Sequence, residues 1–160
     1  MSSAAAGFGH LTIVGADSYD DVTFDYSNGS PLALNPGGGN FSPFGSVYVD
    51  AAGGKGSTTI LNGNFDWVEE QKGDAVNGKI LLAANGNVDS ITYDNHQWVI
   101  LDYNSVQDLY LDLPYSSKNP DALIGDDQYD DLGYSDLRGS TFAWTNFYNP
   151  ANSLTVYLGN

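Results

Sequence analysis

The chain contains no cysteine and few positively charged residues. It has five Lys and Arg against 20 Asp and Glu in 160 residues, which gives a formal net charge of −15. The absence of cysteine excludes disulfides, zinc–thiolate sites and cysteine nucleophiles. The scarcity of cations argues against nucleic-acid binding, which depends on Lys and Arg neutralising phosphates, and against binding to anionic membranes. The charge instead favours cations and basic partners.

Helical signals are almost absent as well. Only Glu69 and Glu70 are glutamates, so nearly all the acids are aspartates, which are poor in helices and common in turns. No segment approaches the roughly 18 apolar residues of a membrane-spanning helix. The N-terminus lacks the basic segment and apolar run of a signal peptide. We expect residues 1–9 to form a flexible arm and residues 10–160 to form a single β-domain.

Turn signals separate short alternating segments. The chain holds four Asn-Gly pairs, which begin at Asn28, Asn62, Asn77 and Asn85. Such pairs between alternating segments predict hairpins with type I′ turns, and Asp94-Asn95 is a further two-residue turn signal. In one expected strand, Phe65, Trp67 and Glu69 should share a face. In another, Gln107–Leu113, leucines alternate with polar residues, as in a half-buried strand. Residues 57–113 therefore predict an antiparallel meander of about six strands.

Five more strands are expected outside the meander, at His10–Val14, Asp21–Tyr26, Ser46–Asp50, Thr141–Phe147 and Ser153–Leu158. The predicted fold is all-β: an antiparallel, jelly-roll-like β-sandwich or a barrel of roughly 10–12 short strands. Two segments, Pro31–Phe44 and Asp121–Gly139, are expected to be long loops. Asp20–Asp25 resembles Asp89–Asp94, but alternating strands produce such similarity by chance.

Aspartates crowd into the second of these loops. They are Asp121, Asp126, Asp127, Asp130, Asp131 and Asp136. Clustered carboxylates attract a cation, and oxygen ligands suit Ca²⁺. An EF-hand is excluded because, counting from Asp126, Asp131 stands where that motif needs glycine and Leu137 where it needs glutamate. We therefore predict an irregular Ca²⁺ site formed by Asp126, Asp127, Asp130, Asp131 and Asp136. The alternative is a solvated acidic loop without a cation.

Aromatic residues flank the same loop. Tyr129, Tyr134 and Trp144 could stack on a sugar beside the carboxylates, or they could pack the loop onto the domain. The neighbouring Phe142 favours the second interpretation, with Trp144 in the core. A flat row of exposed aromatics beside the loop would favour sugar binding.

No catalytic motif is present. The chain lacks G-x-S-x-G, and its only histidines are His10, next to the expected arm, and His96, at the start of an expected strand. Two lone histidines give little basis for a triad or a zinc site. We expect a protein that is not an enzyme.

Two functions fit these features. The first is a structural subunit of a virion or extracellular assembly, such as a phage capsid decoration or head or tail protein, acting as a homo-oligomer with protein partners. A rigid β-core, an acidic surface and Gly/Pro-rich loops suit such a docking role. The second is a carbohydrate-binding or adhesin-like β-sandwich module, assisted by Ca²⁺ through the aspartate loop. Both place the protein on a virion or at an extracellular surface.

Overall fold

The computed structural model describes residues 10–16, 19–30, 46–52, 56–73, 76–114, 121–126 and 133–159. These residues form thirteen strands and no helix. The strands are β1 (His10–Val14), β2 (Asp21–Asp25), β3 (Ser46–Asp50), β4 (Gly56–Leu61), β5 (Asn64–Lys72), β6 (Gly78–Ala84), β7 (Asn87–Asp94), β8 (His96–Asp102), β9 (Ser105–Asp112), β10 (Leu123–Asp126), β11 (Tyr134–Arg138), β12 (Trp144–Tyr148) and β13 (Ser153–Tyr157). All eleven strands expected from the sequence are confirmed; His10–Val14 and Ser46–Asp50 have the predicted bounds, and the ends of the others are shifted.

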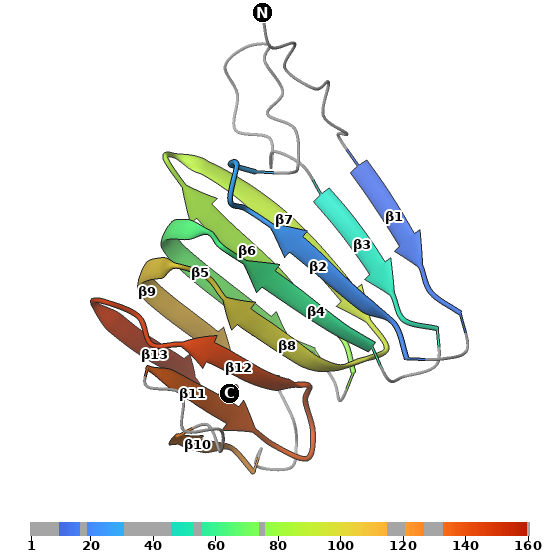
Figure 1. Ribbon diagram of the computed structural model, residues 1–160. Coiled ribbons are helices and arrows are strands. Elements are labelled where there is room, and N and C mark those ends of the chain that lie inside the picture. The colour runs from blue at the N-terminus through green and yellow to red at the C-terminus, as the bar shows by residue number, and fades with distance from the viewer. Residues whose placement is uncertain are drawn as a thin grey trace, which may run out of the picture.

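The strands form two sheets that lie as two layers (Figure 1). The seven-stranded sheet has the order β1-β3-β7-β6-β5-β9-β13, and the six-stranded sheet has the order β10-β11-β12-β8-β4-β2. Each described sheet ends in open edge strands, so neither closes into a barrel. One hydrophobic cluster takes buried side chains from both sheets, for example Val68 and Leu109 from the first and Ile60 and Phe147 from the second. The all-β prediction is confirmed.

The predicted antiparallel arrangement is wrong for most of the described strand pairs. Seven of the eleven pairings are parallel. Antiparallel pairing is confined to β5-β6-β7 and β10-β11-β12. The expected six-stranded meander over residues 57–113 therefore reduces to three adjacent strands in one sheet.

The reason lies in the turns. Asn85-Gly86 has positive φ at both residues (53° and 76°) and joins β6 to β7 in the predicted hairpin. Asn62 and Asn95 also have positive φ, 61° and 60°, but the chain crosses from one sheet to the other at each of them. A residue with positive φ can therefore occur either in an arch that connects the two sheets or in a hairpin within one sheet. The local sequence does not distinguish these two kinds of turn.

The arches repeat. β3-β4-β5 and β7-β8-β9 follow the same path between the sheets, and β4 and β5 lie parallel beside β8 and β9. Ile60 is in register with Leu101, and Val68 is in register with Leu109. The sequence similarity between Asp20–Asp25 and Asp89–Asp94 does not mark this repeat, because the two segments lie in different sheets.

Two strands, β10 and β11, lie inside the segment Asp121–Gly139 that the sequence predicts as a loop. They extend the second sheet beyond β12, and β10 is its edge (Figure 1). The expected arm at residues 1–9 and the expected loop Pro31–Phe44 lie outside the described residues. The part of the chain that is described contains no helix long and apolar enough to cross a membrane.

Candidate functional site

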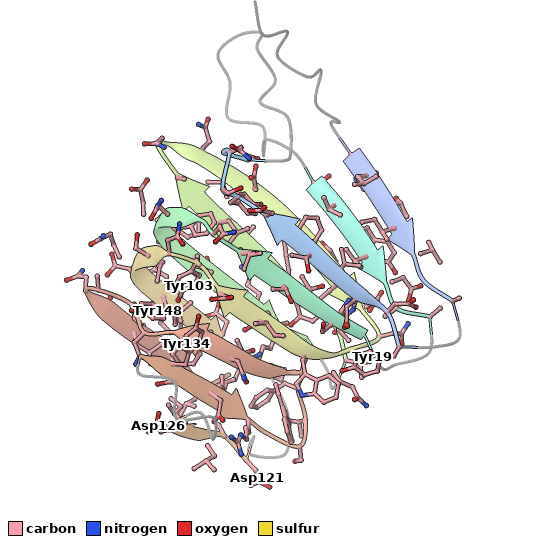
Figure 2. All side chains as sticks on the ribbon, in the orientation of Figure 1. Tyr19, Tyr103, Asp121, Asp126, Tyr134 and Tyr148 are labelled. Atoms are coloured by element: carbon pink, nitrogen blue, oxygen red, sulfur yellow. The ribbon has the colours of Figure 1, made fainter. Side chains whose placement is uncertain are left out.

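The predicted calcium ligands are only partly described. Asp127, Asp130 and Asp131 lie outside the described residues. Asp126 is exposed on the edge strand β10 (Figure 2), whereas Asp136 is buried on β11 and accepts a hydrogen bond from the Arg138 guanidinium. In the described part of the chain, no three His, Cys, Asp or Glu side chains are grouped to hold a metal ion. The calcium site stays a prediction, and Arg138 already neutralises one of its five carboxylates.

Trp144 lies on the surface and not in the core. It is 44% exposed, its Nε1 donates to the carbonyl of Gly139 at 3.1 Å, and the Arg138 guanidinium lies 5.8 Å from the ring centroid. The prediction of a core position was wrong because alternation along β12 turns Thr145 and Phe147 inward, which points Trp144 outward. Phe142 is buried, as expected.

Tyr134 packs against the strand next to it. Its ring meets Tyr148 edge to face at 5.2 Å, and its hydroxyl donates to Asp102. Figure 2 shows Tyr134, Tyr148 and Tyr103 gathered at one end of the second sheet. Tyr129 lies outside the described residues. These contacts hold β11 against β12 and β8, which is the packing role expected for Tyr134.

The outer face of the seven-stranded sheet carries a hollow of about 300 Å³ that is lined by aromatic side chains. Its lining consists of Trp67, Glu69, Tyr110 and Tyr157. These residues come from β5, β9 and β13, which lie side by side and parallel. Register places Glu69 directly beside Tyr110, and alternation turns the neighbouring Val68 into the core.

Two of the rings that line the hollow lie nearly parallel to each other. Tyr110 and Tyr157 stack with centroids 6.5 Å apart and planes only 12° from parallel. Tyr157 is 54% exposed, while Trp67 and Tyr110 are partly exposed. Flat aromatic surfaces with polar groups at their rim bind ligands that have both an apolar face and hydroxyl groups.

One carboxylate, Glu69, lines this hollow, and a second, Asp112, lies beside the lining residue Tyr157 in register. Glu69 accepts a hydrogen bond from Gln71 Nε2 at 2.7 Å. Asp112 is next to Gln71 and Tyr157 in register, and its Oδ1 is buried without a hydrogen bond from any described residue. Burial, and after it the negative charge of Glu69, raises the pKa of Asp112. The pair can therefore accept hydrogen bonds or a positive charge from a ligand.

The same face continues into a second, more polar hollow of about 450 Å³. It is lined by His10, Thr12, Ser46, Val47, Tyr48, Lys79, Ser90 and Thr92. Lys79 on β6 is next to Gln71 on β5, so this hollow adjoins the aromatic one. Together the two hollows extend across the whole sheet from β1 to β13.

A buried polar cluster between the sheets is separate from this face. The fully buried Lys72 donates to Glu70 Oε1 and to the carbonyl of Ala143, both at 2.8 Å, and also to the Thr145 hydroxyl. Thr145 and Tyr93 donate to Glu70 at 2.7 and 2.9 Å. Every charged group here has several partners, so the cluster joins β5 and β7 to β12 rather than presenting reactive groups to solvent.

The sequence interpretation missed the aromatic hollow. Phe65, Trp67 and Glu69 were expected to share one face, but Phe65 is buried while Trp67 and Glu69 point outward. The alternation changes phase between Phe65 and Val68, and the parallel partner β9 makes the same change between Val106 and Leu109. The signal in the sequence was that aromatic and acidic residues alternate with buried ones in both β5 and β9. That pattern can be recognised as one surface only when the parallel register of the two strands is known.

The chain matches no family model, no curated protein and no solved structure.

Proposed function

We propose that the protein is a non-enzymatic, adhesin-like carbohydrate-binding module built on a sandwich-like pair of sheets. The observation that carries the proposal is the hollow on the outer face of the seven-stranded sheet, where Trp67, Tyr110 and Tyr157 gather beside Glu69. The sequence predicts that a glycan-binding module would show a flat row of exposed aromatics beside the aspartate loop, whereas these aromatics lie on the other sheet from β10 and β11.

The chemistry of a sugar matches this hollow. The C–H face of a pyranose ring is apolar and stacks on aromatic rings, while its hydroxyl groups donate to carboxylates. The rings are fixed by a sheet rather than a loop, so little conformational entropy is lost when a ligand binds.

The histidines support a role without catalysis. His96 is buried, and burial lowers its pKa. His10 contacts the hydroxyls of Ser46 at 2.9 Å and Thr12 at 3.2 Å. A Ser–His pair that catalyses acyl transfer needs a third group, such as a carboxylate, to orient the imidazole. Here the second ring nitrogen of His10 contacts a hydroxyl instead.

The test is a binding isotherm with the oligosaccharides that score highest in a glycan array. Trp67→Ala and Tyr110→Ala should each weaken binding about tenfold, because a lost stacking contact is worth about 0.5–1.5 kcal/mol beyond its buried area. Trp144→Ala is the matched control: it removes an exposed tryptophan from the other sheet and should leave affinity unchanged. Loss of binding in Trp144→Ala with full binding in Trp67→Ala would move the site to the other face, and the proposal would fail.

Calcium assistance belongs to the same proposal. Of the predicted ligands, Asp126 lies on β10 and Asp136 on β11, in the other sheet from the aromatic hollow, whereas Asp127, Asp130 and Asp131 are outside the described residues. We therefore expect Ca²⁺ to raise the melting temperature without changing glycan affinity directly. Melting curves with Ca²⁺ and with EDTA test this expectation, and identical curves would exclude the cation site.

A second candidate is the structural subunit of a virion or extracellular assembly, acting as a homo-oligomer. The observation in its favour is that β1 and β13 end the larger sheet as open parallel edges, with Leu154 38% and Leu158 64% exposed at the second edge. Open edges pair with further strands unless something blocks them. Light scattering tests this function: a closed oligomer that Leu154→Lys converts to monomers would support it, and a monomer at high concentration would exclude it.

A further inference from the structure

The carboxylates at the aromatic hollow have no cationic partner in the described structure. The two ion pairs of the described residues, Lys72–Glu70 and Arg138–Asp136, both lie elsewhere. Glu69 lines the hollow, and the charge of Glu69 acts on Asp112, whose buried Oδ1 receives no hydrogen bond from a described residue. Two neighbouring carboxylates in a partly buried position repel each other unless a proton or a cation lies between them.

The third carboxylate near the hollow behaves differently. Asp108 accepts hydrogen bonds from Asn152 at 2.7 Å and from the Ser153 hydroxyl at 2.6 Å. Its charge is thus already stabilised within the fold. Among the described residues, Glu69 accepts one hydrogen bond, from Gln71, and Asp112 Oδ1 accepts none, so these are the two carboxylates that a ligand would complete.

The surroundings also favour a positive charge. The faces of Trp and Tyr rings attract ammonium groups, and the effect is largest where water is partly excluded. The net charge of −15 adds a long-range attraction for cations. Charge complementarity and ring geometry thus agree on a ligand that is both flat and cationic.

We propose that the hollow lined by Trp67, Glu69, Tyr110 and Tyr157 binds a glycan with free amino groups, that is, an oligomer of an amino sugar. The pyranose ring stacks on the exposed ring of Tyr157, whose plane is nearly parallel to that of Tyr110, and its ammonium group lies between the carboxylates of Glu69 and Asp112. This inference rests on the proposed function and specifies the class of sugar. A lysine side chain would supply the charge, but its flexible stem would leave the flat ring surface without a matching partner.

The test uses three matched β-1,4-linked hexasaccharides, of glucosamine, N-acetylglucosamine and glucose, titrated by calorimetry at mildly acidic pH and low salt. The glucosamine hexamer should bind about tenfold more tightly than either neutral hexamer, as expected for a charge-assisted contact. The preference should shrink as salt is added, because ions screen partly exposed charges.

Variants separate this inference from the function on which it rests. Glu69→Gln and Asp112→Asn keep the shape of the site and should weaken binding of the glucosamine hexamer about tenfold more than binding of the neutral hexamers, which removes the preference for glucosamine. Trp67→Ala should weaken all three ligands. Asp126→Asn removes one negative charge from the other sheet and should leave the affinity for all three hexamers unchanged. It controls for the effect of the protein's net charge.

Each alternative result has a distinct meaning. Equal binding of all three hexamers, with Trp67→Ala still weakening them, would overturn the amino-sugar inference and leave the proposed function standing. No binding of any hexamer would remove both. Competition by oligolysine that is equally strong in native protein and in Trp67→Ala would show attraction by bulk charge alone, and it would also overturn the inference.

Discussion

Replacing Lys72 by methionine should destabilise the protein by about 3–5 kcal/mol, the usual cost of breaking a buried ion pair from one side. The Lys72 ammonium is fully buried, lies 2.8 Å from Glu70 Oε1 and stands 5.2 Å from the centroid of the Phe142 ring. At an effective dielectric constant of about 20, a pair 2.8 Å apart attracts by about 6 kcal/mol. Desolvation offsets most of that gain, and burial accordingly lowers the pKa of Lys72 despite the attraction of Glu70.

The prediction can be tested because removing one charge of the buried pair should cost more than removing both charges. Methionine fills the space of the lysine stem but leaves the Glu70 carboxylate buried with hydrogen bonds only from Tyr93 and Thr145. The double variant Glu70→Gln/Lys72→Met removes both charges, and its amide oxygen can accept a hydrogen bond from one of the two hydroxyls while its amide nitrogen donates to the other. Its destabilisation should be smaller than the sum of the single variants by about 2 kcal/mol.

Urea denaturation at neutral pH measures all three variants against the native protein. Equal m-values are needed, so that a change in the midpoint reports a change in the free energy of unfolding. If Lys72→Met costs less than about 1 kcal/mol, the cluster is not the desolvated network described above, and the energetic reasoning is refuted.

Two further predictions concern buried tyrosines. Tyr26, Tyr93 and Tyr103 are buried, and burial is the largest cause that raises the pKa of each. These three tyrosines ionise near pH 10 only in the unfolded chain, so their contribution to stability is intact below about pH 10 and stability should fall by roughly 4 kcal/mol per pH unit above it. Alkaline unfolding followed by circular dichroism measures this, and a flat profile up to pH 12 would contradict it. Gly78→Ala should cost about 3 kcal/mol in urea, because a Cβ there would lie 2.3 Å from the Tyr93 hydroxyl. Gly86→Ala, whose Cβ would meet nothing within 4 Å but which has φ of +76°, should cost only about 1 kcal/mol; equal losses would show that Tyr93 adapts freely.

The positions of strands could be predicted from sequence because their signals are local. The alternation in Gln107–Leu113 holds in the structure, where Leu109, Leu111 and Leu113 are buried and Asp108, Tyr110 and Asp112 are not. The sheet to which a strand belongs could not be predicted. Positive φ at Asn62 turns the chain toward the other sheet, while positive φ at Asn85 folds it back within one, and both are followed by glycine.

The candidate site depends on that missing information. Trp67, Tyr110 and Tyr157 are far apart in the chain and come together only because β5, β9 and β13 are parallel and in register. An antiparallel meander would place different residues opposite one another. The aspartates between Asp121 and Gly139 predicted a cation site because they are close in sequence. Residues that are close in sequence need not be close in space. In this fold, distant residues come together because successive arches stack with their strands parallel and in register.

Parallel register also separates binding from stability. In β5 and β9 the inward column contains Val68 beside Leu109 and the outward column contains Glu69 beside Tyr110, so alternate residues of one strand build the core and the face proposed to bind a ligand. A substitution in the outward column leaves the inward packing in place, and surface changes of this kind usually alter stability by less than about 0.5 kcal/mol. Tyr110→Ala should therefore lose glycan affinity while its urea midpoint stays close to that of the native protein. A parallel loss of stability would mean that the aromatic hollow is part of the packing of the sheet and not a surface left free for a ligand.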